Sequence, residues 1–264
     1  VIDINNINSP QISKYVLKDQ NISKLALSHT RNRLYIANGK TISVYNVSSA
    51  LDPTHVADID LSSILTDGSE KVADIKVSDD RDHGYIISRQ GIFIVIDLSN
   101  NTVLNDTLPN VSIAYYNHIE NSLGLYNSDY AYIAMRSSTS MNIYRVNLAT
   151  ITSSNITVDT ILADDATYNY LYPTSIAASS DHLYISNTAG TVTIAYNTAP
   201  FTIRATFDSE GNANHVDLDW EHSNLFIANS NNGIASYTLA DKITPALLNT
   251  VDNSEYPSKH IALS

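Results

Sequence analysis

Short runs in which apolar and polar residues alternate recur along the whole chain, and clusters of Asn, Asp, Ser and Gly separate them. Alternation with a period of two is typical of β-strands, because successive side chains point to opposite faces of a sheet. Runs with helical periodicity are hard to find. The pattern therefore predicts an all-β protein built from many short strands.

The strands fall into a repeat that has an aromatic residue at the centre of its second strand. These aromatic residues are Tyr35, Tyr85, Tyr132, Tyr184 and Phe226. The preceding runs KLALS, DIKVS, SIAYY, SIAAS, HVDLD and HIALS centre on Ala26, Lys76, Ala114, Ala177, Asp217 and Ala262. A third run ends in a short polar residue that can bond the following turn, namely Asn46, Asp97, Asn147, Asn197 or Thr238. A weaker fourth run completes each repeat.

Four strands in about 40 to 50 residues are the signature of a β-propeller blade. The ends of the chain complement each other, since VIDI (1–4) and KYVLKD (14–19) match third and fourth strands, whereas HIALS (260–264) matches a first strand. We therefore expect one domain over residues 1–264, a six-bladed propeller of four-stranded antiparallel blades. Residues 1–19 would supply the outer strands and residues 259–264 the inner strand of a shared closing blade. Its second strand would come from a longer natural chain or from a partner.

Composition narrows the classes of partner. The chain has 15 Lys and Arg against 27 Asp and Glu, a formal charge of −12, which argues against nucleic acid or an anionic membrane surface. It has no cysteine, so disulfides, zinc-thiolate sites and cysteine nucleophiles are excluded. No apolar run approaches the roughly 20 residues of a membrane helix, so membrane insertion within this chain is not expected.

The sequence resembles the LVIVD repeat of bacterial and archaeal propellers, and also the propeller repeats of surface-layer-type proteins. The matching segments are 1–4, 8–10, 26–28 and 34–37 in the first repeat, IFIVIDLSNN (92–101) in the second and YAYIAMR (130–136) in the third. The resemblance implies the propeller fold and an extracellular or cell-surface location. It implies no reaction.

Two acidic groups are candidates for cation binding. Asp79, Asp80 and Asp82 fall between the first two strands of a blade, where they make either a solvated turn or a cation site. Asp217 and Asp219 alternate on an inner strand and so share one face, with Glu221 beyond them. They could hold Ca²⁺ in the channel, or they could be bonded to backbone, water or a lysine such as Lys76. Apart from this possible Ca²⁺, we expect no cofactor.

Two further groups are candidates for a binding rim. Tyr168, Tyr170 and Tyr172 lie with Asp164 and Asp165 in the long link 163–173, where they make a ligand platform or pack the loop down. The links from fourth to first strands, including 62–71, should lie beside the turns from second to third strands. Other residues expected at that rim are Asn38, Arg89, Arg136, Asn187, His215, Asn229, Lys259 and His260. The arginines and the lysine could receive a carboxylate or form salt bridges.

No Gly-x-Ser-x-Gly, His-Glu-x-x-His or glycine-rich phosphate loop occurs in the sequence. Fold alone does not give function, since propellers include both binding proteins and enzymes. We predict a non-catalytic interaction module of an extracellular or cell-surface protein that binds a protein, a glycan or a sibling subunit through one rim. Two alternatives are a structural subunit of a surface layer or filament, with self-assembly by strand addition, and a lactonase-like or lyase-like enzyme with a channel cation.

Overall fold

A computed structural model describes residues 2–3, 11–12, 22–49, 52–105, 122–126, 129–136, 141–152, 155–162, 173–197, 202–219 and 221–251. Over these residues the protein is almost entirely β-strand, with one 3-10 turn at Asp79–Arg81. The chain divides into two compact units, Val1–Leu108 and Pro109–Ser264, and each is described by itself. No helix in the described ranges is long and apolar enough to cross a membrane.

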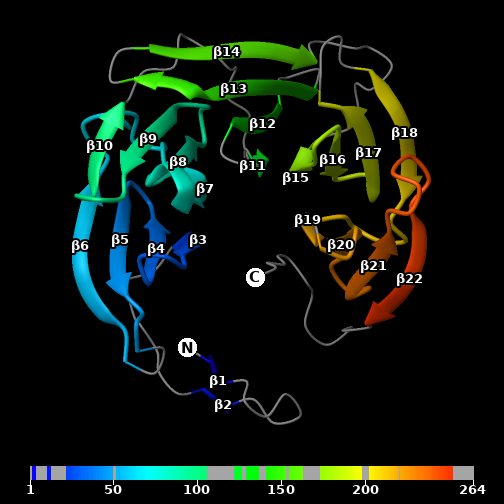
Figure 1. Ribbon diagram of the computed structural model, residues 1–264, viewed down its shortest axis with the longest axis horizontal. Helices are drawn as coiled ribbons and strands as arrows, with labels where there is room; N and C mark the ends of the chain where they lie inside the picture. The colour runs from blue at the N-terminus through cyan, green and yellow to red at the C-terminus, as the bar shows by residue number, and fades with distance from the viewer. Residues whose placement is uncertain are drawn as a thin grey trace. The chain divides into compact units, whose positions relative to one another are not determined.

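Unit one contains two four-stranded antiparallel sheets and one short pair (Figure 1). The first sheet runs in the order β3 (Ile22–Ser28), β4 (Arg33–Asn38), β5 (Thr41–Asn46) and β6 (Thr54–Asp60). The second runs in the order β7 (Val72–Ser78), β8 (His83–Ser88), β9 (Phe93–Asp97) and β10 (Thr102–Asn105). The pair consists of β1 (Ile2–Asp3) and β2 (Gln11–Ile12).

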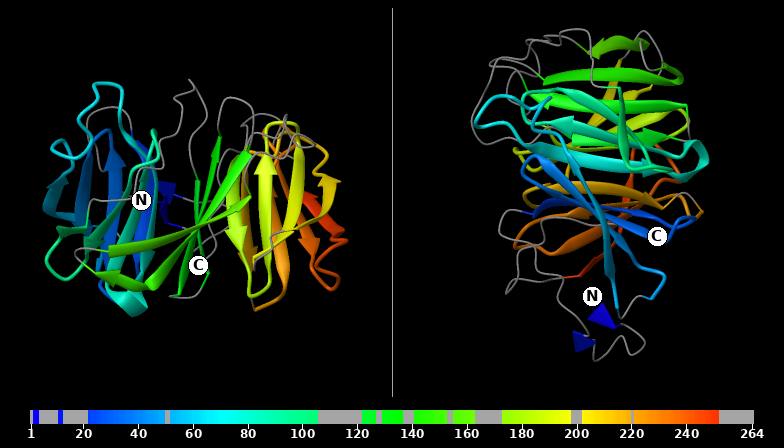
Figure 2. Two further views of the ribbon diagram at one scale, coloured as in Figure 1. Left: turned by 90° about the horizontal axis from the view of Figure 1, so that it is seen from above. Right: turned by 90° about the vertical axis from the view of Figure 1, so that its left-hand side faces the viewer.

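Unit two contains three sheets of the same kind. The first comprises β11 (Ser122–Tyr126), β12 (Tyr130–Arg136), β13 (Met141–Thr152) and β14 (Asn155–Leu162). The second comprises β15 (Pro173–Ala178), β16 (His182–Asn187), β17 (Thr191–Tyr196) and β18 (Ile203–Asp208). The third comprises β19 (His215–Asp219), β20 (Asn224–Ala228), β21 (Ile234–Thr238) and β22 (Ala246–Val251). In every sheet sequential strands are neighbours, as Figures 1 and 2 show.

The register confirms the repeat and corrects one strand of it. The aromatic residue of each second strand pairs with the central residue of the first strand, in the pairs Ala26–Tyr35, Lys76–Tyr85, Gly124–Tyr132, Ala177–Tyr184 and Asp217–Phe226. In the third repeat the first strand is β11, so the assignment of SIAYY with Ala114 was wrong. Gly124 takes the central place because a Cβ there would lie 2.8 Å from the Ile176 carbonyl oxygen of the next sheet. Residues 112–116 lie outside the described residues.

Apolar side chains between neighbouring sheets form the core of each unit. In unit one, fully buried Tyr35 and Val44 of the first sheet pack in one cluster with Ile75, Ile86 and Ile94 of the second. Unit two has corresponding clusters, in which the buried aromatic residues Tyr132 and Tyr184 take part. Burial on both faces explains why the middle strands read as nearly continuous apolar runs.

One face of β3 remains exposed. Its residues Ile22, Leu25 and Leu27 are 46%, 58% and 44% exposed, which is unusual for apolar side chains in a regular strand. The shared closing blade would need to cover a surface of this kind. Of that blade the structure describes only β1 and β2, which pair Ile2 with Ile12, whereas residues 14–19 and 259–264 lie outside the described residues.

The short polar residues predicted to end the third strands were Asn46, Asp97, Asn147, Asn197 and Thr238. Oxygens of Asn46, Asp97, Asn147 and Thr238 each accept a hydrogen bond from the backbone N–H two residues later, at 2.7–3.3 Å. This confirms the predicted turn role for Asn46, Asp97 and Thr238, whereas Asn147 makes the same bond inside β13, which continues to Thr152. Asn197 differs, because its side-chain amide donates to the Ser179 carbonyl oxygen.

Candidate binding rim

In unit one the turns from second to third strands are hydrogen-bonded to the link between the two sheets. The backbone N–H of Leu61 donates to the Lys40 carbonyl at 2.9 Å, and that of Val72 donates to the Gly39 carbonyl at 2.8 Å. On the other side of the link, the backbone N–H of Arg89 donates to the Lys71 carbonyl at 2.9 Å. The prediction that the link 62–71 lies beside these turns is therefore confirmed.

Unit two repeats this arrangement with a shorter link. Residues 209–213 lie between the turns 187–190 and 229–233, and these three segments together are called the rim of unit two. Ser209 donates its backbone N–H and its hydroxyl to the Gly190 carbonyl, at 3.0 and 2.7 Å. From the other turn, the Asn229 side-chain amide donates to the Ser209 carbonyl and that of Asn232 donates to the Glu210 carbonyl.

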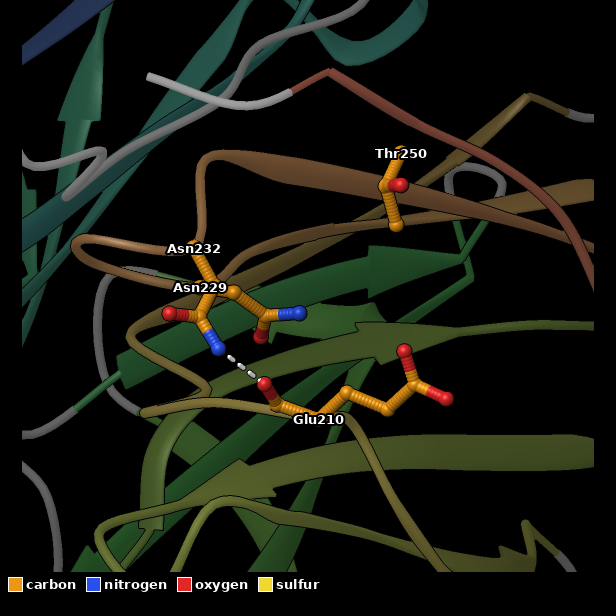
Figure 3. A pocket seen from close by; sticks show the side chains of 4 residues that line it. All are labelled: Glu210, Asn229, Asn232 and Thr250. Carbon is orange, nitrogen blue, oxygen red and sulfur yellow. Dashed lines mark hydrogen bonds between the residues drawn. The ribbon is translucent and has the colours of Figure 1, made fainter. Parts of the chain in front are cut away.

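A pocket of about 290 Å³ opens on this rim. Its lining residues are Glu210 of the link, Asn229 and Asn232 of the turn from β20 to β21, and Thr250 of β22. Figure 3 shows the Glu210 carboxylate, the Asn229 carboxamide and the Thr250 side chain around one open space, with Asn232 bonded to the Glu210 backbone at its edge. All four of the described lining residues have polar side chains.

The Oδ1 atom of Asn229 is a buried hydrogen-bond acceptor without a partner among the described residues. The residue is only 2% exposed, and its Oδ1 has no hydrogen-bond partner among the described residues. A buried carbonyl oxygen without a partner costs roughly 1–3 kcal/mol. Because Oδ1 itself is buried, a ligand in the pocket does not reach it, and this cost belongs to the folded chain.

In unit one, Asp79 lies in the turn between the first and second strands of its sheet, and it joins the two sheets of the unit. Its carboxylate accepts hydrogen bonds from the Ser28 hydroxyl and from the backbone N–H groups of His29, at 2.9 Å, and Thr30, at 3.2 Å. Asp82 forms an ion pair with Arg31, with 2.6 Å between its Oδ1 and the Arg31 Nη2. Asp79 and Asp82 therefore connect their turn to the turn at residues 28–31, which is a structural role beyond that of a solvated turn. Nothing in the described residues supports the alternative of a cation site.

Asp79→Ala should lower the free energy of unfolding by about 1–2 kcal/mol, because three hydrogen bonds to a charged, partly exposed carboxylate are lost. Urea denaturation followed by circular dichroism measures the change. Glu221→Ala is the control, since Glu221 occupies the corresponding turn from β19 to β20 and is exposed. Equal losses in the two variants would contradict the connecting role of Asp79.

The same comparison should depend on pH. Burial opposes ionisation of Asp79, but the hydrogen bonds from Ser28, Thr30 and His29 outweigh it and lower the pKa of the carboxyl. A lowered folded-state pKa stabilises the protein fully above the unfolded value of about 3.9, and this stabilisation is lost as the pH falls through the folded value. The difference between wild type and Asp79→Ala should therefore shrink on acidification.

The two predicted metal ligands lie on β19 but have other partners. Asp219 accepts hydrogen bonds from the backbone N–H of His222 at 3.2 Å and from its ring at 2.8 Å. Asp217 accepts one from the backbone N–H of Leu218 at 2.9 Å. Over the described residues, no three or more His, Asp or Glu side chains are grouped to hold a metal ion. No third ligand from the described part of the chain joins the pair, and the Ca²⁺ site stays a prediction.

The predicted rim residues are only partly described. Arg89 follows β8 and bonds the link 62–71 through its backbone, and His215 begins β19, two residues after the rim segment 209–213, and is 8% exposed. Arg136 ends β12, but its side chain is outside the described part. Tyr168, Tyr170, Tyr172 and His260 also lie outside the described residues, as do Asp164, Asp165 and Lys259.

Of the pocket residues, only Asn229 was among the residues predicted from the sequence for the rim. Glu210, Asn232 and Thr250 were missed. The signal for the first two was a pair of polar turn segments, DSEGNAN (208–214) and NSNNG (229–233), in consecutive positions of the repeat. Thr250 carries no such signal, because it lies in an exposed outer strand that only the folded sheet brings beside the link.

No protein-family model matches the chain, and no curated protein matches its sequence. Solved structures do resemble it. One is the β-propeller domain of Cps50 (Swd1) from Myceliophteria thermophila, with a TM-score of 0.66, 11% identity and coverage of 90% of this chain and 74% of that one. Another is a functionally unknown protein from Desulfotomaculum acetoxidans, with a TM-score of 0.68, 10% identity and coverage of 90% and 72%.

At this level of identity the likeness shows the fold alone. It supports the β-propeller predicted from the repeats, in which each four-stranded sheet is a blade. The described residues form five such sheets, so the count of six blades with a shared closing blade stays a prediction. The relation to LVIVD-repeat or surface-layer-type propellers also stays a prediction.

Proposed function

We propose that the protein is a non-catalytic interaction module that binds its partner at the rim of unit two. The observation that carries this proposal is the pocket there, whose described lining residues, Glu210, Asn229, Asn232 and Thr250, are all polar. Nearby polar groups of the rim, such as Ser209 and Asn232, bond backbone atoms of the neighbouring segment. They hold the pocket in shape, which suits recognition of a ligand by a preformed surface.

The proposal includes an extracellular or cell-surface setting. The formal charge of −12 and the absence of cysteine are compatible with it, and the resemblance to exported propellers favours it. A structural subunit of a surface layer and a channel enzyme are the competing proposals. Neither has an observation of its own in the described residues comparable with the pocket.

Binding of the purified chain to peptide and glycan arrays tests the proposal. Asn232→Arg should abolish the signal of the bound ligands, because Asn232 is exposed at the pocket edge and a long cationic side chain would fill the pocket. The matched control Glu221→Arg places the same side chain on an exposed turn between β19 and β20 and should bind as wild type does. Absence of binding, or equal binding by all three proteins, would overturn the proposal.

A further inference from the structure

We infer that the protein forms a symmetric dimer in which β22 (Ala246–Val251) of one copy pairs side by side with β22 of a second copy. The inference goes beyond the proposed function and does not rest on it, since a monomer could equally bind a ligand at the rim. The evidence lies in the free edge of this strand, in its exposed apolar side chains and in its lack of charge.

β22 is the edge strand of its sheet. It pairs with β21 on one side, and on its other side no strand of the described residues pairs with it (Figure 1). Every residue of the strand is exposed. The backbone of an exposed edge strand is a template on which a further strand can add, so this edge is open to pairing.

Large apolar side chains are concentrated on this edge strand. Leu247, Leu248 and Val251 are 44%, 55% and 60% exposed. A single exposed leucine on a protein surface is ordinary and needs no explanation. Three such side chains in one short strand form a contiguous apolar patch, which is typical of an interaction surface.

A β-bulge does not distinguish β22 from the other outer strands. Bulges twist an edge and so discourage the addition of strands. The pairing of β22 with β21 skips Leu248, and the pairings of β6 and β18 skip Val56 and Arg204 in the same way. Each of these strands therefore has one extra residue, and the difference lies elsewhere.

The difference is charge, which natural proteins place on edge strands to keep them apart. β22 contains no charged residue, and β10 (Thr102–Asn105) is uncharged as well but is shorter, with half-buried Val103 and Leu104. The charged residues in the remaining outer strands are Asp58 and Asp60 of β6, Asp159 of β14, and Arg204 and Asp208 of β18. Of these outer strands, β22 alone combines full exposure with a neutral, apolar edge.

This neutrality favours a second copy of the chain as the partner. The chain has a formal charge of −12, so two copies repel each other at most surfaces. Two antiparallel β22 strands set no charged residue opposite another, whereas two β6 strands would bring Asp58 and Asp60 together. A two-fold axis relates such a pair and closes the assembly at two copies. The interface is small, so the dimer should be weak and depend on concentration.

Sedimentation velocity of the whole chain over a range of concentrations tests the inference. We expect a reversible equilibrium between monomer and dimer. Added salt should strengthen the dimer, because it screens the repulsion between two acidic copies, whereas an interface of opposite charges would weaken. A chain that stays monomeric at every concentration, or that grows into larger assemblies, would overturn the inference. If a monomeric chain gains protection of its β22 amides with an array peptide, the edge belongs to a peptide partner instead.

Leu248→Lys should raise the dissociation constant of the dimer more than tenfold, although it lowers the net negative charge of the chain. Residue 248 lies near the centre of the strand, so the two-fold axis brings the two new charges close together. Val56→Lys is the matched control, because Val56 is the extra residue of β6 and is 43% exposed. This control should dimerise as wild type does. Equal effects of the two substitutions would place the interface elsewhere and contradict the inference.

Hydrogen exchange locates the interface without any substitution. Amides of residues 246–251 should exchange more slowly at concentrations where the dimer forms, and amides of β6 should exchange at an unchanged rate. A dimer that leaves the exchange of residues 246–251 unchanged uses another surface and would also overturn the inference.

Discussion

Replacing Tyr184 with alanine should lower the free energy of unfolding by about 3–5 kcal/mol, as truncation of a large aromatic residue in a core does. Tyr184 is fully buried, and it belongs to the cluster that joins the sheets β15–β18 and β19–β22, with Val216 and Leu225. The loss combines the transfer free energy of the ring with the cavity left between two sheets. The shift of the urea unfolding midpoint measures it.

Tyr184→Phe separates ring packing from the hydroxyl group. The hydroxyl donates to the Lys242 carbonyl at 3.4 Å, which is a long and weak hydrogen bond. Burial, together with the nearby carboxylates of Asp181 and Asp241, raises the pKa of the phenol, so the group stays neutral at ordinary pH. The phenylalanine variant should therefore lose less than about 1 kcal/mol. A loss as large as that of the alanine variant would show that packing between the sheets is not the cause.

Replacing Gly190 with alanine should lower the free energy of unfolding by roughly 2–4 kcal/mol, since backbone strain and overpacking add. The residue has a φ of +78°, and a Cβ there would lie 2.2 Å from the Gly211 carbonyl oxygen. The link 209–213 would have to move, which would break the hydrogen bonds from Ser209 to the Gly190 carbonyl. Thermal and urea unfolding measure the loss.

Gly39→Ala is the matched control for this prediction. Gly39 occupies the corresponding turn of the first sheet with a φ of +61°, but a Cβ there meets no atom within 4 Å. Alanine at position 39 should therefore lose only about 1 kcal/mol, from the backbone conformation alone. Because the backbone conformations are similar, the difference between the variants isolates the contact between turn and link. Equal losses would contradict that contact.

Much of the fold could be predicted from the sequence, because a strand is a local pattern. The aromatic residue of each second strand and the short polar residue that ends each third strand depend on alternation and turn chemistry within a few residues. The prediction of the first strand of the third repeat was wrong, and the reason is not local. Glycine has low β-propensity, and Gly124 at a strand centre is explained only by the close approach of Ile176 from the next sheet.

For the candidate site, too, local pattern predicted one part and contacts between distant segments decided the rest. By itself the sequence determined that the chain is all-β and repeats four strands, and it placed Asn229 at a rim, because alternation and turn residues act over short distances. The tertiary structure decided that Asp79 connects two sheets. It also decided that Glu210, Asn229 and Thr250 line one pocket. Ser28 and Asp79 are 51 residues apart, and the pocket residues come from three separate segments, so no local pattern records that these residues meet.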